Sequence, residues 1–311
     1  MTPVPPAGRD GSARLAVLAA AVLFSTGGAA IKASSLSGWQ VAFLRSCVAA
    51  VALALFCPRS LRAGGWRAAA GGAAYSVVIL LFVLANKLTT AANAIFLQSA
   101  SPFYLLLLAP WLLKERVRGR DVALILVMAA GMGLCLAGSP PAAATAPNPA
   151  LGNALGAAAA VAWAVTLIGL RSLAGGQDSG DKALGMVVWG NIIAGLVAAP
   201  FAFPVGAMPA RDWLVIGYLG VFQIALAYVC LTAGMRRVPA LEASLLLLVE
   251  PVLNPVWAWL AHGEDPGAWS IAGGALILAA AAVQTLLGSA ARRAAGPKAD
   301  GTQVRCPGQP V

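Results

Sequence analysis

The sequence is dominated by long apolar runs, each of about the length that crosses a lipid bilayer. A helix needs about 20 predominantly apolar residues to span the hydrocarbon core. Such runs lie near residues 14–32, 39–57, 68–86, 91–112, 121–138, 151–170, 184–205, 213–234, 239–261 and 267–288. In hydrocarbon, backbone amides find partners only within helices or closed barrels, and the alternating pattern of a barrel is missing here. We therefore predict an all-α integral membrane protein with ten transmembrane helices.

Composition excludes several other classes of protein. Only 10% of the residues are charged and 60% are hydrophobic, whereas a soluble domain carries about 25% charged residues. The net charge of +10 does not indicate nucleic acid, because the basic residues lie in short loops beside apolar runs. The five cysteines form no CxxC pair, and the single histidine, His262, is expected at the surface beside an outer loop. We expect no cofactor, no metal site and no enzymatic activity.

The distribution of Lys and Arg predicts the orientation of the chain. Cytoplasmic loops retain positive charge. With the N-terminus placed inside, 17 of the 21 Lys and Arg residues fall in inner segments, and only Lys32, Lys87 and Arg211 fall in outer ones. Arg45 lies within a span. We expect a multi-pass protein of the cell (inner) membrane with both termini in the cytoplasm.

The chain also repeats itself at an offset of 149 residues. Residues 91–102 end in Pro102 and continue to Glu115, and residues 240–251 end in Pro251 and continue to Glu264. Five spans in each copy would place the second copy upside down relative to the first, an arrangement typical of secondary transporters. The predicted organisation is a cytoplasmic segment (1–13), two five-helix repeats (14–138 and 151–288), an outer linker (139–150) and a disordered cytoplasmic tail (289–311).

This doubled motif resembles the EamA-type family of the drug/metabolite transporter superfamily. The resemblance rests on Leu248-Val-Glu250-Pro251 followed by Gly263-Glu264, and on Arg45 near the start of the second span. In the first copy, Leu113-Lys-Glu115 replaces the Gly-Glu turn, so no special role transfers to Lys114. The resemblance implies a carrier with a central cavity between inverted repeats. It also implies export of amino acids, related metabolites or drug-like compounds. We expect Glu115 and Glu264 to be structural turn residues.

Glu250 is the main candidate for a substrate or coupling residue. It lies near mid-membrane, directly before Pro251, which cannot donate a backbone hydrogen bond and so frees the carbonyl of Leu247. A carboxyl beside exposed carbonyls can bind a proton or a substrate amine, and the alternative is a packed glutamate that fixes its helix. Ionisable residues inside a membrane usually face a cavity or a partner. Pro102 and Pro251 are the predicted hinges of the two repeats.

The remaining candidate residues are polar or aromatic groups within the spans. Arg45 has three open interpretations: snorkelling to the outer interface, an interhelical salt bridge, or a substrate contact. Gln98, Ser101 and Gln223 could orient a zwitterion, or form hydrogen bonds between helices. Trp163, Tyr75 and Tyr228, together with Phe24, could line an aromatic pocket or serve as ordinary packing residues.

These observations favour a secondary transporter that moves a small metabolite by alternating access. No GxxxxGK[ST] motif is present, so ATP is not the expected direct energy source. Proton-coupled export, facilitative uniport and import within the same family remain alternatives. A membrane-embedded enzyme would need clustered His, Asp or Cys residues, and a channel would need charged rings or carbonyl filters. The expected partners are a small-molecule substrate, the bilayer and, in the coupled case, protons; the oligomeric state is not predicted.

Overall fold

The fold is known from a computed structural model that describes residues 8–63, 65–112, 119–137, 143–173, 179–238 and 240–294. Within these ranges, eight helical segments are long and apolar enough to cross a membrane. Two shorter apolar helices, Ala91–Leu107 and Val122–Ala137, occupy the positions of the predicted fourth and fifth spans. The prediction of an all-helical membrane protein with ten spans is confirmed.

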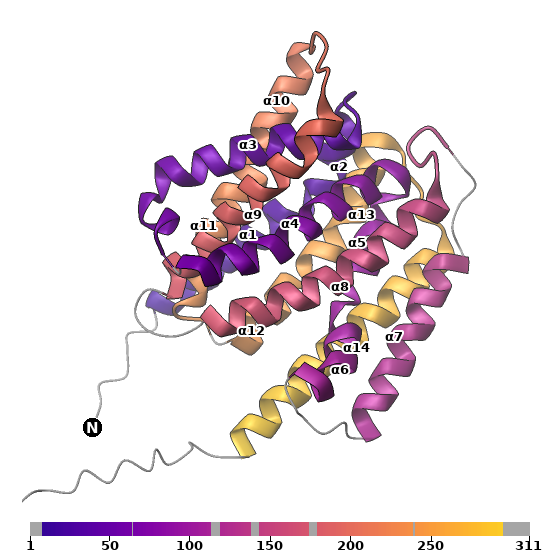
Figure 1. Ribbon diagram of the computed structural model, residues 1–311. Helices are drawn as coiled ribbons and strands as arrows, with labels where there is room; N and C mark the ends of the chain where they lie inside the picture. The colour runs from indigo at the N-terminus through magenta and orange to yellow at the C-terminus, as the bar shows by residue number, and fades with distance from the viewer. Residues whose placement is uncertain are drawn as a thin grey trace, which may run out of the picture.

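The helices follow the chain in two sets of five spans (Figure 1). The first set consists of α1 (Gly8–Ser25), α2 (Gly27–Ala33), α3 (Gly38–Phe56), the short 3-10 helix η1 (Pro58–Leu61), α4 (Gly65–Leu88), α5 (Ala91–Ser99), α6 (Ser101–Leu112) and α7 (Gly119–Ala137). The second set consists of α8 (Pro149–Leu173), α9 (Ser179–Ala202), α10 (Ala210–Tyr218), the π-helix η2 (Leu219–Leu226), α11 (Ala227–Met235), α12 (Ala240–Leu247), α13 (Val249–His262) and α14 (Ala268–Ala294).

Both ends of the helical region extend beyond the predicted boundaries. Helix α1 begins at Gly8, within the segment expected to precede the first span, and α14 continues to Ala294. Residues 289–294 are therefore helical, although the sequence suggested disorder from residue 289. They are mainly Ala and Arg, which are strong helix formers, so the helix continues past the apolar run. The remaining tail, 295–311, lies outside the described residues.

Four of the spans are interrupted. The first breaks at Thr26, between α1 and α2, and the eighth passes through the π-helix η2. The fourth breaks at Ala100 and the ninth at Leu248. The latter two breaks lie two or three residues before Pro102 and Pro251, where the missing proline N–H weakens the helix.

The two halves pack against each other through corresponding helices, with an approximate two-fold symmetry. The second span of each half packs on the other (α3 on α9), and so does the fifth (α7 on α14). Helix α4 packs on α8, and in the corresponding position of the other half α11 packs on α1. Because each half has an odd number of spans, these corresponding helices run in opposite directions. The packing therefore agrees with the inverted repeat predicted from sequence.

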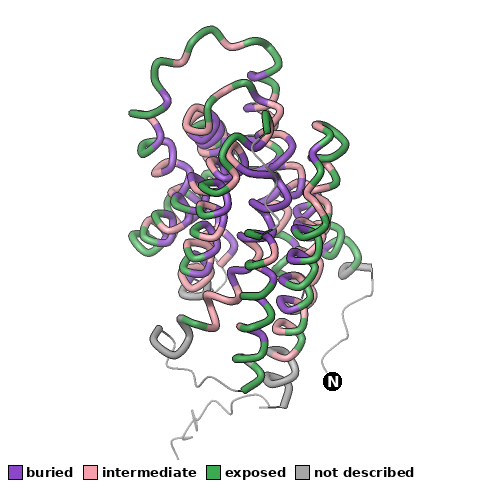
Figure 2. The backbone as a smooth tube through the Cα atoms, turned by 90° about the vertical axis from the view of Figure 1, so that its right-hand side faces the viewer, coloured by how far each residue is buried: buried purple, intermediate pink, exposed green. Residues whose placement is uncertain are grey.

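The outer surface of the bundle is apolar, as lipid contact requires. Buried residues line the interior of the bundle and exposed ones its flanks (Figure 2). Large side chains such as Leu55, Leu196 and Leu214 are at least 70% exposed. Apolar surface of this extent would be costly in water, and the bilayer supplies the matching solvent.

Glycines allow the two halves to approach closely. A Cβ atom on Gly72 of α4 would lie 2.8 Å from the backbone nitrogen of Gly190 on α9. A Cβ on Gly131 of α7 would lie 2.8 Å from the carbonyl oxygen of Gly273 on α14. Small residues at such crossings permit the tight packing on which helix association in a membrane depends.

The bundle has two distinct ends. One end, here called the linker face, holds the connections 34–37, 89–90, 143–148, 203–209 and 263–267. The opposite end, here called the terminal face, holds the start of α1, the end of α14 and residues 57–63 and 236–238. In Figure 1 the labels of α2 and α10 lie toward the linker face, away from the N-terminus.

Candidate functional site

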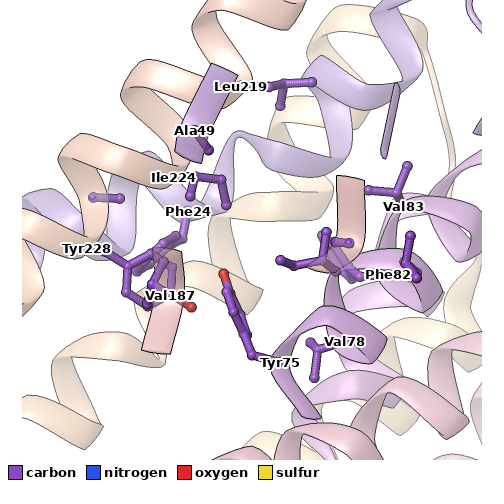
Figure 3. Close-up of a cluster of buried hydrophobic side chains, with 14 of the residues drawn as sticks. Phe24, Ala49, Tyr75, Val78, Phe82, Val83, Val187, Leu219, Ile224 and Tyr228 are labelled. Atoms are coloured by element: carbon purple, nitrogen blue, oxygen red, sulfur yellow. The ribbon is translucent and has the colours of Figure 1, made fainter. Parts of the chain in front are cut away.

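An aromatic cluster lies at the centre of the bundle, where the two halves meet. Phe24 of α1 contacts Tyr228 of α11 with ring centroids 5.0 Å apart, and Tyr75 of α4 lies 6.2 Å from Trp163 of α8. The two tyrosine rings are 5.6 Å apart in an edge-to-face arrangement. Figure 3 shows Phe24 and Tyr228 together, with Tyr75 beside them. The sequence grouped these four residues as a possible pocket lining, and the fold brings them together.

Two ionisable groups interact with the tyrosine pair. Tyr75 and Tyr228 each interact electrostatically with Arg45 of α3 and with Glu250 of α13. Glu250 is partly buried in the first turn of α13, and it forms no ion pair or hydrogen bond with any other described residue. The alternative of a hydrogen-bonded structural glutamate therefore finds no partner in the described part of the chain.

Arg45 does not reach the membrane interface. Its side chain is only 2% exposed, so the snorkelling interpretation is wrong. Its Nε and Nη1 atoms have no hydrogen-bond partner among the described residues, and no ion pair there involves it. The described part of the chain therefore contains no salt bridge between helices that involves Arg45.

Gln223 lies in the π-helix η2, directly against the break in the first span. A Cβ on Gly27 would lie 2.8 Å from the Gln223 Nε2 atom, and the buried Gln223 Oε1 has no hydrogen-bond partner in the described part of the chain. Nearby, the Thr26 and Tyr218 hydroxyls are 2.8 Å apart. Short π-helices occur frequently at functional sites. The sequence selected Gln223 but gave no signal for the π-helix or for the break at Thr26.

Gln98 and Ser101 lie on either side of the break at Ala100, in the fourth span. Gln98 Oε1 is buried and has no hydrogen-bond partner among the described residues, and Ser101 is 5% exposed. Among the described residues, the ring contacts and electrostatic interactions of the tyrosine pair involve neither of them.

The linker face is tied together by a buried ion pair. Lys32 at the end of α2 lies 3.1 Å from Glu264, and their side chains are 3% and 4% exposed. The Lys32 ammonium also donates to the backbone carbonyls of Thr89 and Thr145. Glu264 accepts a hydrogen bond from the backbone N–H of Ala91 at the start of α5. Glu264 was expected to be only a turn residue, but it instead joins both halves; its counterpart Glu115 lies outside the described residues.

Further polar contacts support the same face. Asp212 of α10 is fully buried and accepts hydrogen bonds from the backbone N–H and the hydroxyl of Ser35. The Lys87 ammonium donates to the Ser34 carbonyl at 2.7 Å. His262 was expected at the surface, but it is partly buried and its Nε2 atom lies 2.8 Å from the Ala29 carbonyl oxygen.

The ion pairs Arg14–Glu242 and Arg236–Asp181 lie on the terminal face. Arg14 pairs with Glu242 at 2.6 Å, and these side chains are 55% and 34% exposed. Arg236 and Asp181 are 4.0 Å apart and are also solvent-accessible. Exposed ion pairs of this kind contribute about 0–1 kcal/mol.

The sequence contained one signal for the linker-face pair. Lys32 follows an apolar run on the side where the charge distribution predicts few basic residues, and Glu264 follows another such run. Within the described residues no group of three His, Cys, Asp or Glu side chains could hold a metal ion.

Comparison with known proteins identifies relatives over most of the chain. The EamA-like transporter family matches residues 11–137 and 150–286. The pseudopaline exporter CntI of Pseudomonas aeruginosa is 27% identical, covering 86% of this chain and 93% of the exporter. The aromatic amino acid exporter YddG of Ancylobacter novellus is 30% identical, covering 65% of this chain and 70% of the exporter. A solved crystal structure has a TM-score of 0.59 with 25% identity, and covers 91% of this chain and 99% of its own.

Proposed function

Because the chain belongs to the EamA-like transporter family, we propose that it is a secondary carrier that exports a small amphipathic metabolite, such as an amino acid, by alternating access. Two relatives are named as exporters, one of pseudopaline and one of aromatic amino acids, which supports the direction and the substrate class. The site proposed to bind this metabolite is the aromatic cluster between the halves, with Glu250 and Arg45 at its edges.

The observation that carries the mechanism is the isolated carboxyl of Glu250. A carboxylate in a low-dielectric interior is costly unless a positive charge or a proton accompanies it. Tyr75 and Tyr228 interact electrostatically with it and with Arg45, and no described residue forms an ion pair with it. We infer that a proton and the amine of the substrate alternate on this carboxyl. Proton entry would then drive substrate exit.

Reconstitution in vesicles tests the coupling. The wild-type protein should accumulate its substrate against a gradient when a pH difference is imposed, and it should show saturable counterflow, which a channel would not. Glu250→Gln should abolish the accumulation driven by the pH difference. Glu242→Gln is the matched control, because that glutamate pairs with Arg14 on the terminal face and should leave the pH response intact. Unchanged pH-driven accumulation by Glu250→Gln would rule out coupling at this residue.

A metabolite comparison of cells with and without the gene would identify the substrate. Overexpression should lower the intracellular level of the transported compound and raise resistance to its toxic analogues. Increased intracellular accumulation would contradict export.

The proposed orientation places the terminal face, with both chain ends, in the cytoplasm. The distribution of Lys and Arg supports it, since 17 of the 21 fall on that side or on segments predicted to lie there. Ser35→Cys on the linker face should react with an impermeant thiol reagent added to intact cells. Arg62→Cys on the terminal face should react only after lysis, and the reverse pattern would overturn the orientation.

A further inference from the structure

The Arg45 guanidinium lacks an anionic partner among the described residues. It is 2% exposed, and its Nε and Nη1 donors are unsatisfied. An arginine stays protonated in proteins, so it cannot avoid the cost of burial by losing its proton. A buried charge without a partner costs several kcal/mol. Groups of this kind that persist in a membrane interior usually serve a substrate or an ion pathway.

The surroundings of Arg45 indicate which ligand would compensate it. The rings of Tyr75 and Tyr228 interact with it electrostatically, and their hydroxyls are hydrogen-bonded to each other, which leaves one hydroxyl proton free to donate to an anion. The planar guanidinium presents N–H donors in the geometry of a carboxylate or another oxyanion. The side chain arises from α3, the second span, and it interacts with tyrosines of the third and eighth spans.

We propose that Arg45 binds the carboxylate of the transported molecule, with the free hydroxyl proton of the Tyr75–Tyr228 pair completing an anion site. This inference rests on the proposed function of the same site and narrows its substrate class. Glu250 interacts with the same tyrosine pair and takes the amine, so the substrate is a zwitterion. The aromatic rings of Phe24 and Trp163 pack against its apolar part.

Ligand-induced thermal stabilisation of the purified protein tests this site without requiring transport. The probes are L-phenylalanine, L-phenylalaninamide, which lacks the carboxylate, and 3-phenylpropionate, which lacks the amine. Phenylalanine should stabilise the wild type most and the amide least. Arg45→Met should raise the apparent Kd for phenylalanine and phenylpropionate roughly 10- to 100-fold, because a charge-assisted contact with the carboxylate is lost. Glu250→Gln should weaken the binding of phenylalanine but leave the binding of phenylpropionate unchanged.

Stability without ligand distinguishes a binding group from a structural one. Arg45→Met removes an uncompensated charge, so the unliganded variant should melt at or above the wild-type temperature. Arg62→Met, at an exposed loop position, is the matched control and should change neither melting nor probe binding. Inorganic phosphate should stabilise the wild type less than phenylpropionate does, because phosphate has no apolar part for the aromatic rings.

Three results would overturn the proposal. The first is an Arg45→Met variant that melts far below the wild type or does not fold, which would make Arg45 structural. The second is an Arg45→Met variant that still binds phenylalanine more tightly than its amide. The third is a wild-type protein that none of the carboxylate probes stabilises. Arg45-dependent binding without pH-driven transport would reject only the proposed coupling, and pH-driven transport without such binding would reject only the anion site.

Discussion

At the scale of single residues, the central cluster depends on side chains held in place by close backbone contacts. A Cβ on Gly190 would lie 2.5 Å from Cδ1 of Tyr75 and 3.1 Å from the Gly72 carbonyl oxygen. Tyr75 can therefore take its position only because residue 190 has no side chain. The geometry of the proposed site thus depends on a residue that does not touch the substrate.

We predict that Gly190→Ala displaces Tyr75 and impairs binding. Overpacking of this kind costs about 1–3 kcal/mol, so the variant should melt lower and bind phenylalanine more weakly. Gly133→Ala is the matched control, because a Cβ there meets nothing within 4 Å, and alanine favours the helix by about 0.5–1 kcal/mol. Thermal melting with and without phenylalanine checks both variants. Equal melting and binding by Gly190→Ala and the wild type would contradict the prediction.

The sequence identified most of the candidate side chains but not their neighbours. A glutamate or an arginine inside an apolar run is conspicuous whatever the fold, and so Glu250 and Arg45 could be selected. Whether Arg45 snorkels or stays buried depends on how α3 packs against α4 and α9, which local sequence does not specify. The same reason explains why Lys32 and Glu264 were not recognised as partners.

At the scale of helices, hydropathy predicted the number and place of the spans, because crossing a bilayer requires a long apolar run. Two of the interruptions were also predictable, since a proline removes a backbone donor. The break at Thr26 and the π-helix η2 have no proline and occur where Gln223 packs against Gly27. Such interruptions arise from contacts between distant helices and leave no local pattern.

The break at Leu248 leads to a prediction about turnover. Pro251→Ala restores an N–H that can bond the Leu247 carbonyl, so α12 and α13 should fuse into one helix. A hinge that is lost should lower the rate of counterflow several-fold and leave binding of phenylalanine nearly unchanged. Pro255→Ala is the control, because Pro255 lies inside the continuous α13. A wild-type counterflow rate for Pro251→Ala would show that the break is not a hinge.

At the scale of the whole molecule, the ion pairs found on the two faces differ in burial. Lys32–Glu264 on the linker face is buried, whereas Arg14–Glu242 and Arg236–Asp181 on the terminal face are exposed. Removing one partner of a buried pair is destabilising by about 3–5 kcal/mol, because the other charge stays buried and unpaired. For a carrier that alternates between two open states, such a contact favours the state in which this face is closed.

We therefore predict that Lys32→Gln shifts the population toward an opening at the linker face. The cost of burying an unpaired Glu264 carboxylate falls when water reaches it. The variant should therefore expose the centre of the bundle from the linker face. A cysteine at position 24, in a cysteine-free background, reports this through its reaction with an impermeant reagent added outside. Its labelling should rise several-fold with Lys32→Gln. It should not rise with Arg14→Gln, which breaks only the exposed pair on the terminal face. If both variants label alike, the buried pair does not hold this face closed, and the Asp212–Ser35 contact becomes the next candidate for that role.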